Sequence, residues 1–296
     1  MLSSPRYAVL GCHDLAAAAP FLAALGYTER RRGTLEPDAA AALYGLTGPA
    51  EEVLYLPDGA ETGGLLLVAA PEGSTAIAAG GYGVDLYTRD IEASVADLVA
   101  AGGVPSPTAR WELGGRPFAE CGIVGPGGIR VVLVEGSSRR ASLLDGDETR
   151  RHSELQAAVH LVHGCDAGFW AKLGLEPLYS QRLVNPVVAA LIGIDDPDAE
   201  IVLDLFWDGR GARVELISFP TLDLPAGDDA FASGMRAGVF PVPDLDAAHA
   251  LLAGAGARTG AITESDLRGG RAFTAASPDG VHLEFWTEVS REARRG

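Results

Sequence analysis

Short apolar runs alternate with alanine-rich amphipathic segments along the whole chain, and this alternation predicts strands and helices in a recurring order. The run Tyr7–Cys12 fits a buried strand. Asp14 follows it and can cap a helix over 15–25, which Gly26 ends. Further strands are expected at 27–31, 52–56 and 65–70, with a small extra helix near 37–46. The pattern predicts a unit of one strand, one helix and three strands.

This unit is predicted four times. The second unit starts with a strand over 84–88, and the third and fourth units span about 154–222 and 232–289. Local sequence also repeats between the two halves of the chain. Residues 21–26 (Phe-Leu-Ala-Ala-Leu-Gly) return as residues 169–174 (Phe-Trp-Ala-Lys-Leu-Gly), at an offset of 148 (169 minus 21). An internal repeat of this kind defines the fold more strongly than any single motif.

The repeat divides the chain into two domains. The stretch 137–153 is polar and charged, which is typical of a linker. We therefore expect a first domain over 1–136 and a second domain over 154–290, each with two of the units. A chain of 296 residues is long enough for two such cores.

Charge and composition exclude several classes of function. The net charge of −17 argues against a nucleic-acid partner, which needs clustered lysine and arginine. No apolar run reaches about 18 residues, so a membrane partner is not expected either. The three cysteines are far apart and fit reduced thiols, which favours a cytoplasmic protein. The expected partner is a small-molecule ligand.

Two segments resemble the vicinal oxygen chelate superfamily, which contains glyoxalase I, bleomycin-resistance proteins and extradiol dioxygenases. They are Asp14-Leu15 with Phe21 and Leu25-Gly26, and the ending 277–285 (Ser-Pro-Asp-Gly-Val-His-Leu-Glu-Phe). The resemblance implies an α+β fold of two tandem glyoxalase-like domains, each built from two βαβββ modules. Each pair of modules forms a curled mixed sheet, an open cup with helices outside and the ligand inside.

Strand alternation predicts which side chains face the cup of the second half. In the last strand, Val281, Leu283 and Phe285 form an apolar face suited to helix packing, so His282, Glu284 and Trp286 share the opposite face. By the same argument, Arg213 and Glu215 face the cup from the third unit. We expect Glu284 and Glu215 to act as an acid/base pair, assisted by His282, with Arg213 and Trp286 binding the ligand.

The first half is more apolar and aromatic at the corresponding places. Its predicted lining is Tyr7, Leu66, Asp85, Tyr87, Arg130, Val132 and Val134. This lining suits a flat hydrophobic ligand, bound through Tyr7, Asp85, Tyr87 and Arg130, or a cup that is simply filled. Chemistry is therefore expected in the second half.

The superfamily resemblance also implies metal ligands at the first and last strands of each module. The matching first-strand positions hold Tyr7, Gly83, Ala237 and a residue near Leu155 or Ala157, while Glu215 and Glu284 match the last-strand carboxylates. His160 adds a third ligand if its strand is shifted by one residue. No cofactor is the expectation, and a divalent metal on Glu284, Glu215 and His160 is the alternative.

Three functions remain open from the sequence. The leading hypothesis is a metal-independent enzyme of lyase, isomerase or cyclase type that acts on an organic small molecule. The second is a non-catalytic protein that sequesters a drug-like compound, as bleomycin-resistance proteins do. The third is a metal-dependent glyoxalase-like lyase or dioxygenase. The chain is expected to be a monomer or a homodimer.

Overall fold

The computed structural model describes residues 2–74, 76–113, 115–136, 139–227 and 230–287, and this part of the chain contains the four expected units. The first unit has β1 (Tyr7–Cys12), α1 (Leu15–Ala24), β2 (Tyr27–Leu35), α2 (Pro37–Tyr44), β3 (Ala50–Pro57) and β4 (Gly64–Ala69). The second unit has β5 (Gly80–Thr88), α3 (Ile91–Ala100), β6 (Val104–Pro105), β7 (Ala109–Leu113), β8 (Arg116–Val124), the 3₁₀ turn η1 (Pro126–Gly128) and β9 (Arg130–Gly136).

The second half of the chain repeats this order after the short turn η2 (Leu143–Asp145). The third unit has β10 (His152–Val162), α4 (Ala167–Leu173), β11 (Glu176–Val184), α5 (Pro186–Ile192), β12 (Glu200–Trp207) and β13 (Arg213–Ser218). The fourth unit has β14 (Gly234–Val242), α6 (Leu245–Ala255), β15 (Arg258–Thr259), β16 (Thr263–Ser265), η3 (Asp266–Arg268), β17 (Gly270–Ala276) and β18 (His282–Thr287).

One capping interaction explains where the first helix of every unit begins. Asp14, Asp90, Asp166 and Asp244 each accept a hydrogen bond of 2.9–3.1 Å from the backbone N–H three residues later. These bonds satisfy backbone donors that the first helical turn leaves free. The aspartate that follows each first strand therefore fixes the turn from strand to helix.

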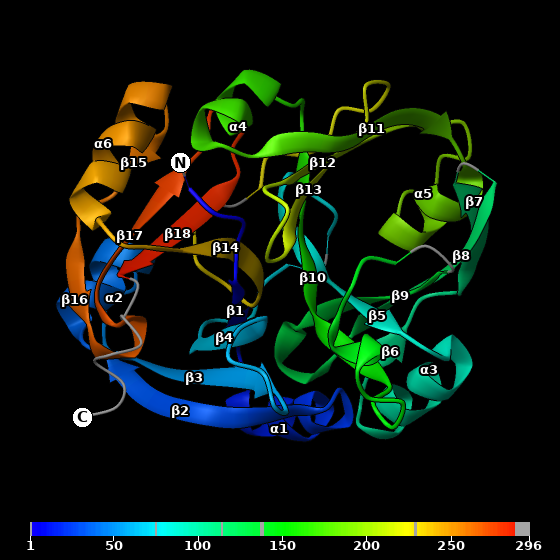
Figure 1. Cartoon of the computed structure of the whole chain (residues 1–296), viewed down its shortest axis with the longest axis horizontal. Helices are drawn as coiled ribbons and strands as arrows, with labels where there is room; N and C mark the ends of the chain where they lie inside the picture. Colours follow the sequence, from blue (N-terminus) through cyan, green and yellow to red (C-terminus); the bar gives the residue numbers. More distant parts are fainter. Residues whose placement is uncertain (1, 75, 114, 137–138, 228–229, 288–296) are drawn as a thin grey trace.

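The strands form two nine-stranded sheets, each drawn from two units (Figure 1). Sheet A combines the first and fourth units in the order β15-β17-β18-β14-β1-β4-β3-β2, with β16 beside β17. Sheet B combines the second and third units in the order β11-β12-β13-β10-β5-β9-β8-β6, with β7 beside β8. The α+β fold with curled mixed sheets is confirmed.

The composition of the two cups differs from the sequence prediction, which paired consecutive units within each half. The first strands of non-consecutive units pair instead: Tyr7 of β1 lies opposite Val239 of β14, and Asp85 of β5 lies opposite Ala157 of β10. All four first strands are apolar with similar alternation, so the sequence permits either pairing. The division at 137–153 describes the sequence repeat, whereas each sheet contains one unit from each half.

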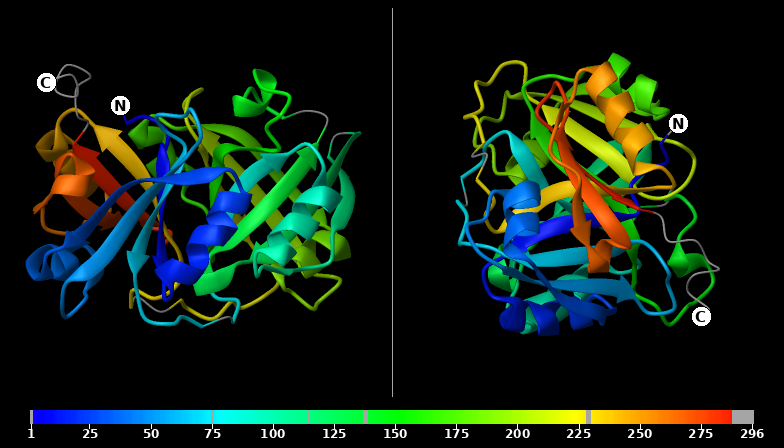
Figure 2. Two further views of the ribbon diagram at one scale, coloured as in Figure 1. Left: turned by 90° about the horizontal axis from the view of Figure 1, so that it is seen from below. Right: turned by 90° about the vertical axis from the view of Figure 1, so that its left-hand side faces the viewer.

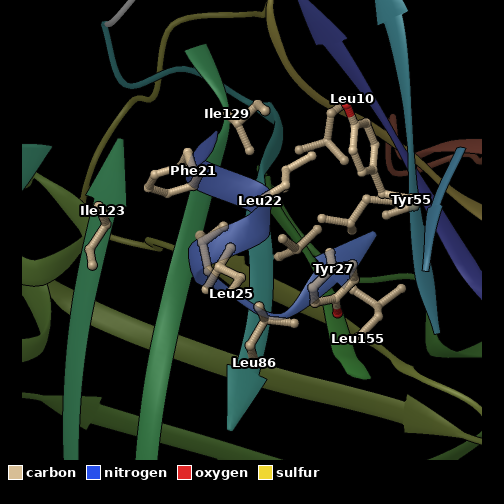
Figure 3. Close-up of a cluster of buried hydrophobic side chains, with 14 of the residues drawn as sticks. Leu10, Phe21, Leu22, Leu25, Tyr27, Tyr55, Leu86, Ile123, Ile129 and Leu155 are labelled. Atoms are coloured by element: carbon tan, nitrogen blue, oxygen red, sulfur yellow. The ribbon is translucent and has the colours of Figure 1, made fainter. Parts of the chain in front are cut away.

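The convex faces of the two sheets share the helical core of the molecule. From below, α1 lies between the strands of sheets A and B (Figure 2). Phe21 and Leu22 of α1 are fully buried and pack with Leu10 of sheet A and Leu86 and Ile123 of sheet B (Figure 3). Helices α4 and α6 cover a second core on the same side of the sheets. None of the helices in the described part of the chain combines the length and hydropathy of a membrane span.

A short helix packs against the concave face of each sheet, and this helix belongs to one of the two units that form the sheet. Helix α2 packs Leu43 and Tyr44 onto the concave face of sheet A, and α5 packs Val188 and Ile192 onto that of sheet B. The sequence predicted the helix near 37–46 but not its position inside a cup. These two helices therefore reduce the open space inside the cups and give the two cups different shapes.

Candidate functional site

The concave face of sheet B encloses a cavity of about 370 Å³, which we call the sheet-B cup. Its apolar walls come from α5, β9, β10 and β12. Its aromatic side chains are Tyr82, Tyr87, Trp111, Phe118 and Tyr179, and its charged side chains are Asp85, Arg116, Glu120, Arg213 and Glu215. A pocket that is largely apolar with a few converging polar groups is typical of small-molecule sites.

Two carboxyl groups meet on the floor of the sheet-B cup. Asp85 of β5 lies opposite Ala157 of β10, and Val159 of β10 lies beside Glu215 of β13, so the central strand brings the two side chains to one face. Burial, and then the negative charge of Glu215, raise the pKa of Asp85 well above its ordinary value, and burial raises the pKa of Glu215. Of the two, Asp85 is therefore the carboxyl that favours its protonated form more strongly.

A third carboxyl group, Glu120 of β8, faces the same cavity. Burial and then the negative charge of Glu215 raise the pKa of Glu120 to about 7, while a hydrogen bond from Trp111 lowers it in part. The indole Nε1 of Trp111 lies 3.0 Å from Oε2 of Glu120. At neutral pH, Glu120 thus exists in both protonation states, as a proton-transfer group requires.

Arg213 provides the positive charge beside these acids. Its Nε donates a hydrogen bond of 3.2 Å to the carbonyl oxygen of Gln156, and its guanidinium lies 5.7 Å from the ring centre of Tyr87. The charge of Arg213 lowers the pKa values of Asp85, Glu120 and Glu215, although burial outweighs this effect. At a given pH, the three carboxyls therefore bind fewer protons than they would if Arg213 were absent.

The structure brings four of the predicted site residues together in the sheet-B cup: Asp85, Tyr87, Arg213 and Glu215. Arg130 is outside the lining of this cavity and lies over the ring of Tyr82, 4.5 Å from its centre. Sequence reasoning missed Glu120 and Trp111. Alternation from Cys121 and Ile123, which pack in the helical core, could have placed Glu120 on the cup face.

The other predicted residues, Tyr7, Glu284 and Trp286, lie in sheet A. Glu284 is fully buried and accepts hydrogen bonds from Arg268 Nε at 2.7 Å, Tyr44 Oη at 2.6 Å and Trp286 Nε1 at 2.5 Å. Glu284 and Glu215 therefore belong to different sheets, and the expected acid/base pair does not form. The reason is that the third unit pairs with the second and the fourth unit pairs with the first. The last strands of the third and fourth units, β13 and β18, therefore lie in different sheets.

The side chain of Arg268 is the centre of a closed ionic network inside the sheet-A cup. It pairs with Glu52 and Glu284, and it donates hydrogen bonds to Ser265 Oγ at 3.0 Å and Tyr44 Oη at 2.8 Å. Tyr44 belongs to α2, so the helix that enters this cup also closes over the network. The carboxylate of Glu284 is occupied by these partners and does not line the cavity at the mouth of the cup.

His160 lies on the opposite face of β10 from Val159 and does not enter the sheet-B cup. Its side chain is buried, and neither ring nitrogen has a hydrogen-bond partner among the described residues. Burial, and then the charge of His282, lower the pKa of His160 to about 3. His282 is half-buried at the start of β18 in sheet A, so it is also separate from Glu215.

His160 is expected to make the protein acid-sensitive. Because its folded pKa of about 3 lies below its ordinary value of 6.5, the unfolded chain takes up a proton first as the pH falls. The contribution of His160 to the free energy of unfolding is thus fully present above pH 6.5 and is lost between pH 6.5 and pH 3. At pH 5 this loss amounts to about 2 kcal/mol. We expect His160→Leu to flatten this part of the pH profile in urea unfolding. The exposed His163→Gln is the control, and an unchanged slope in His160→Leu would contradict the assignment.

The side chains of the sheet-B cup do not fit the metal centre that the superfamily resemblance implies. The described residues contain no group of three His, Cys, Asp or Glu side chains placed to hold an ion. Burial raises the pKa of Asp85 and Glu215, which disfavours the ionised form that binds a metal, and Arg213 adds a positive charge beside them. His160, Glu215 and Glu284, the predicted ligand set, lie on different faces and sheets.

Comparison with protein-family models finds no match, and neither does comparison with curated protein sequences. Solved structures match over nearly the whole chain. Glyoxalase I from Zea mays gives a TM-score of 0.64 at 13% identity, covering 96% of this chain and 92% of that one. A proposed dioxygenase from Bacillus subtilis gives 0.65 at 11% identity, covering 99% and 88%.

These likenesses concern the fold. The chain shares the overall fold of these two structures, and it has the glyoxalase-like α+β fold that the sequence resemblance implied. The activities of the two similar proteins do not transfer at this level of identity, because one fold carries many chemistries. The residues of the sheet-B cup have to support any function by themselves.

Proposed function

We propose that the protein is a metal-independent enzyme that binds an organic small molecule in the sheet-B cup and transfers a proton on it. The observation that carries this proposal is that Asp85, Glu120 and Glu215 converge on one largely apolar cavity. Burial raises the pKa of all three carboxyls, so they hold protons at a higher pH than an isolated carboxyl group does. The cup thus favours the acid form of these groups beside a bound molecule.

The three carboxyls divide the chemistry between them. Glu120, with a pKa of about 7, accepts a proton from the substrate in its ionised form. The pair Asp85–Glu215 returns a proton at a second position, so the substrate is isomerised with no net gain of protons. Arg213 faces the negative charge that develops on the substrate between the two transfers. The same groups give a lyase reaction if a leaving group departs from the substrate in place of the second proton transfer to it.

The pH dependence of turnover tests the role of Glu120. We expect kcat/KM to rise as the pH increases to about 7 and to level off above it, because only ionised Glu120 accepts the proton. Glu120→Gln is expected to remove this rising limb together with most of the activity. Substrates are found by thermal-shift screening of neutral and cationic aromatic compounds, followed by ¹H NMR of the compounds that bind.

Glu112→Gln is the matched control, because Glu112 lies on β7 of the same hairpin and is exposed to solvent. It is expected to keep the wild-type pH profile. A rising limb that persists in Glu120→Gln would assign the titration to another group and remove Glu120 from the mechanism.

Binding without turnover is the second candidate function. Five aromatic side chains in one cup suit an organic molecule with a flat body, since such a molecule stacks on the rings while the polar side chains of the cup orient it. In that case a compound from the screen binds tightly and is recovered unchanged. For either function the proposed partner is a small molecule, not nucleic acid or membrane, and the proposed assembly is a monomer or a homodimer.

A further inference from the structure

A second cavity, of about 780 Å³, lies at the mouth of the sheet-A cup. Its floor is apolar and aromatic. The rings of Tyr7 and Trp286 stack there with centroids 5.1 Å apart and an interplanar angle of 20°, and Leu54, Leu56 and Leu267 complete the floor. Arg268 also lines this cavity, and its ion pairs with Glu52 and Glu284 fill the cup beneath the floor, so the cavity is an open bowl above a filled cup.

The rim of this bowl carries an excess of positive charge that is unusual for the chain. Arg6, Arg30, Arg31 and Arg210 line it, against one lining carboxylate, Glu61. The whole chain has 40 acidic and 23 basic residues, so chance placement would give a mainly acidic rim. Arg30 and Arg31 lie on β2, Arg6 lies just before β1 and Arg210 lies between β12 and β13, so these arginines come together only in the folded protein.

Three of the rim arginines, Arg30, Arg31 and Arg210, are only partly neutralised by described neighbours. Arg30 lies 3.6 Å from a carboxylate oxygen of Asp58, and both side chains are exposed. Arg31 donates a hydrogen bond of 3.2 Å to the backbone oxygen of Asp266, which carries no charge. The guanidinium of Arg210 makes no ion pair with a described residue. Exposed pairs of this kind are weak, so the rim retains donors for a ligand.

We propose that this arginine-rimmed cavity binds an organic anion with a flat or apolar body. The carboxylate, phosphate or sulfonate group of the ligand pairs with the rim, because guanidinium groups offer parallel N–H donors to such oxygens. The body rests on the floor made by Tyr7, Trp286 and the leucines. The low-dielectric floor strengthens the field of the rim, which attracts anions that the rest of the acidic surface repels.

This site goes beyond the proposed function of the sheet-B cup. The two cavities have no lining residue in common, and each belongs to a different sheet. Their charged groups also differ, since the sheet-B cup has three carboxyls beside Arg116 and Arg213, whereas arginines predominate around the sheet-A cavity. Binding at the arginine-rimmed cavity is therefore expected whether or not the sheet-B cup is catalytic.

The test compares an aromatic sulfonate with its neutral analogue on the full chain. Isothermal titration calorimetry with 1-anilinonaphthalene-8-sulfonate is expected to show binding that weakens as salt is added. The double variant Arg31→Gln/Arg210→Gln is expected to weaken it about tenfold or more. The same variant leaves the affinity for N-phenyl-1-naphthylamine, which lacks the sulfonate, unchanged.

Arg182→Gln is the control, because Arg182 is an exposed arginine of β11 that pairs with Glu200 and lies outside both cavities. It is expected to bind the sulfonate as the wild type does. Equal sulfonate affinity in the double variant and the wild type would overturn the proposal, and so would equal losses in the double variant and Arg182→Gln.

Discussion

Replacement of Arg268 by methionine is expected to lower the free energy of unfolding by about 3–5 kcal/mol at pH 7. Arg268 is fully buried and is the cation between Glu52 and Glu284, which are themselves buried. Its loss leaves both carboxylates in the sheet-A cup without a positive partner. Burial already raises the pKa of Glu52 although Arg268 lowers it. Equilibrium unfolding in urea measures the effect.

Two further variants separate charge from packing. Adding Glu52→Gln and Glu284→Gln to Arg268→Met removes the uncompensated charges and is expected to recover much of the lost stability. Arg271→Met is the matched single control, because Arg271 pairs with Asp246 on the surface, and it is expected to cost no more than about 1 kcal/mol. A loss below about 1 kcal/mol in Arg268→Met would mean that the network does not hold this cup together.

Glu215→Gln is expected to lower kcat by about 10²–10⁴-fold on a substrate of the sheet-B cup. Glutamine keeps the shape of the side chain but removes the negative charge that, after burial, raises the pKa of Asp85, so the acid form of Asp85 in the proposed mechanism is less favoured. Ligand affinity is expected to stay near the wild-type value because the apolar and aromatic walls are unchanged. Single-turnover kinetics and calorimetry on the same variant measure the two quantities.

Glu284→Gln distinguishes this mechanism from the one expected from the sequence. Glu284 lies in the other sheet and is held by Arg268, Tyr44 and Trp286, so its replacement is expected to affect stability and leave kcat within about twofold. Loss of turnover in Glu284→Gln with full turnover in Glu215→Gln would contradict the assignment of chemistry to the sheet-B cup.

The local chain pattern was sufficient for the elements and for several site residues. Strand alternation alone placed Arg213 and Glu215 on one face of β13, and Asp85 and Tyr87 on one face of β5, because side chains along a strand alternate strictly. It also placed Glu284 and Trp286 together on β18. These predictions needed only the residues of one strand each.

Glu120 and Trp111 were missed for a related reason. Their hairpin, β7–β8, had no anchored residue in the sequence reasoning, so its faces stayed unassigned although its strands were predicted. The contact between Arg268 and Glu52 could not be predicted from the sequence for a different reason. They are 216 positions apart in the sequence, and only the pairing of the first and fourth units brings them into contact.

The sequence by itself determined the four units, their order, several of the capping aspartates and the facing of single strands, since each depends on residues that are close in the sequence. Which unit pairs with which, and therefore which carboxyls share a cup, was decided by the tertiary structure alone. Four similar apolar strands can pair along their edges in several ways at similar cost. The choice depends on how the helices pack between the two sheets and on which side chains fill each concave face.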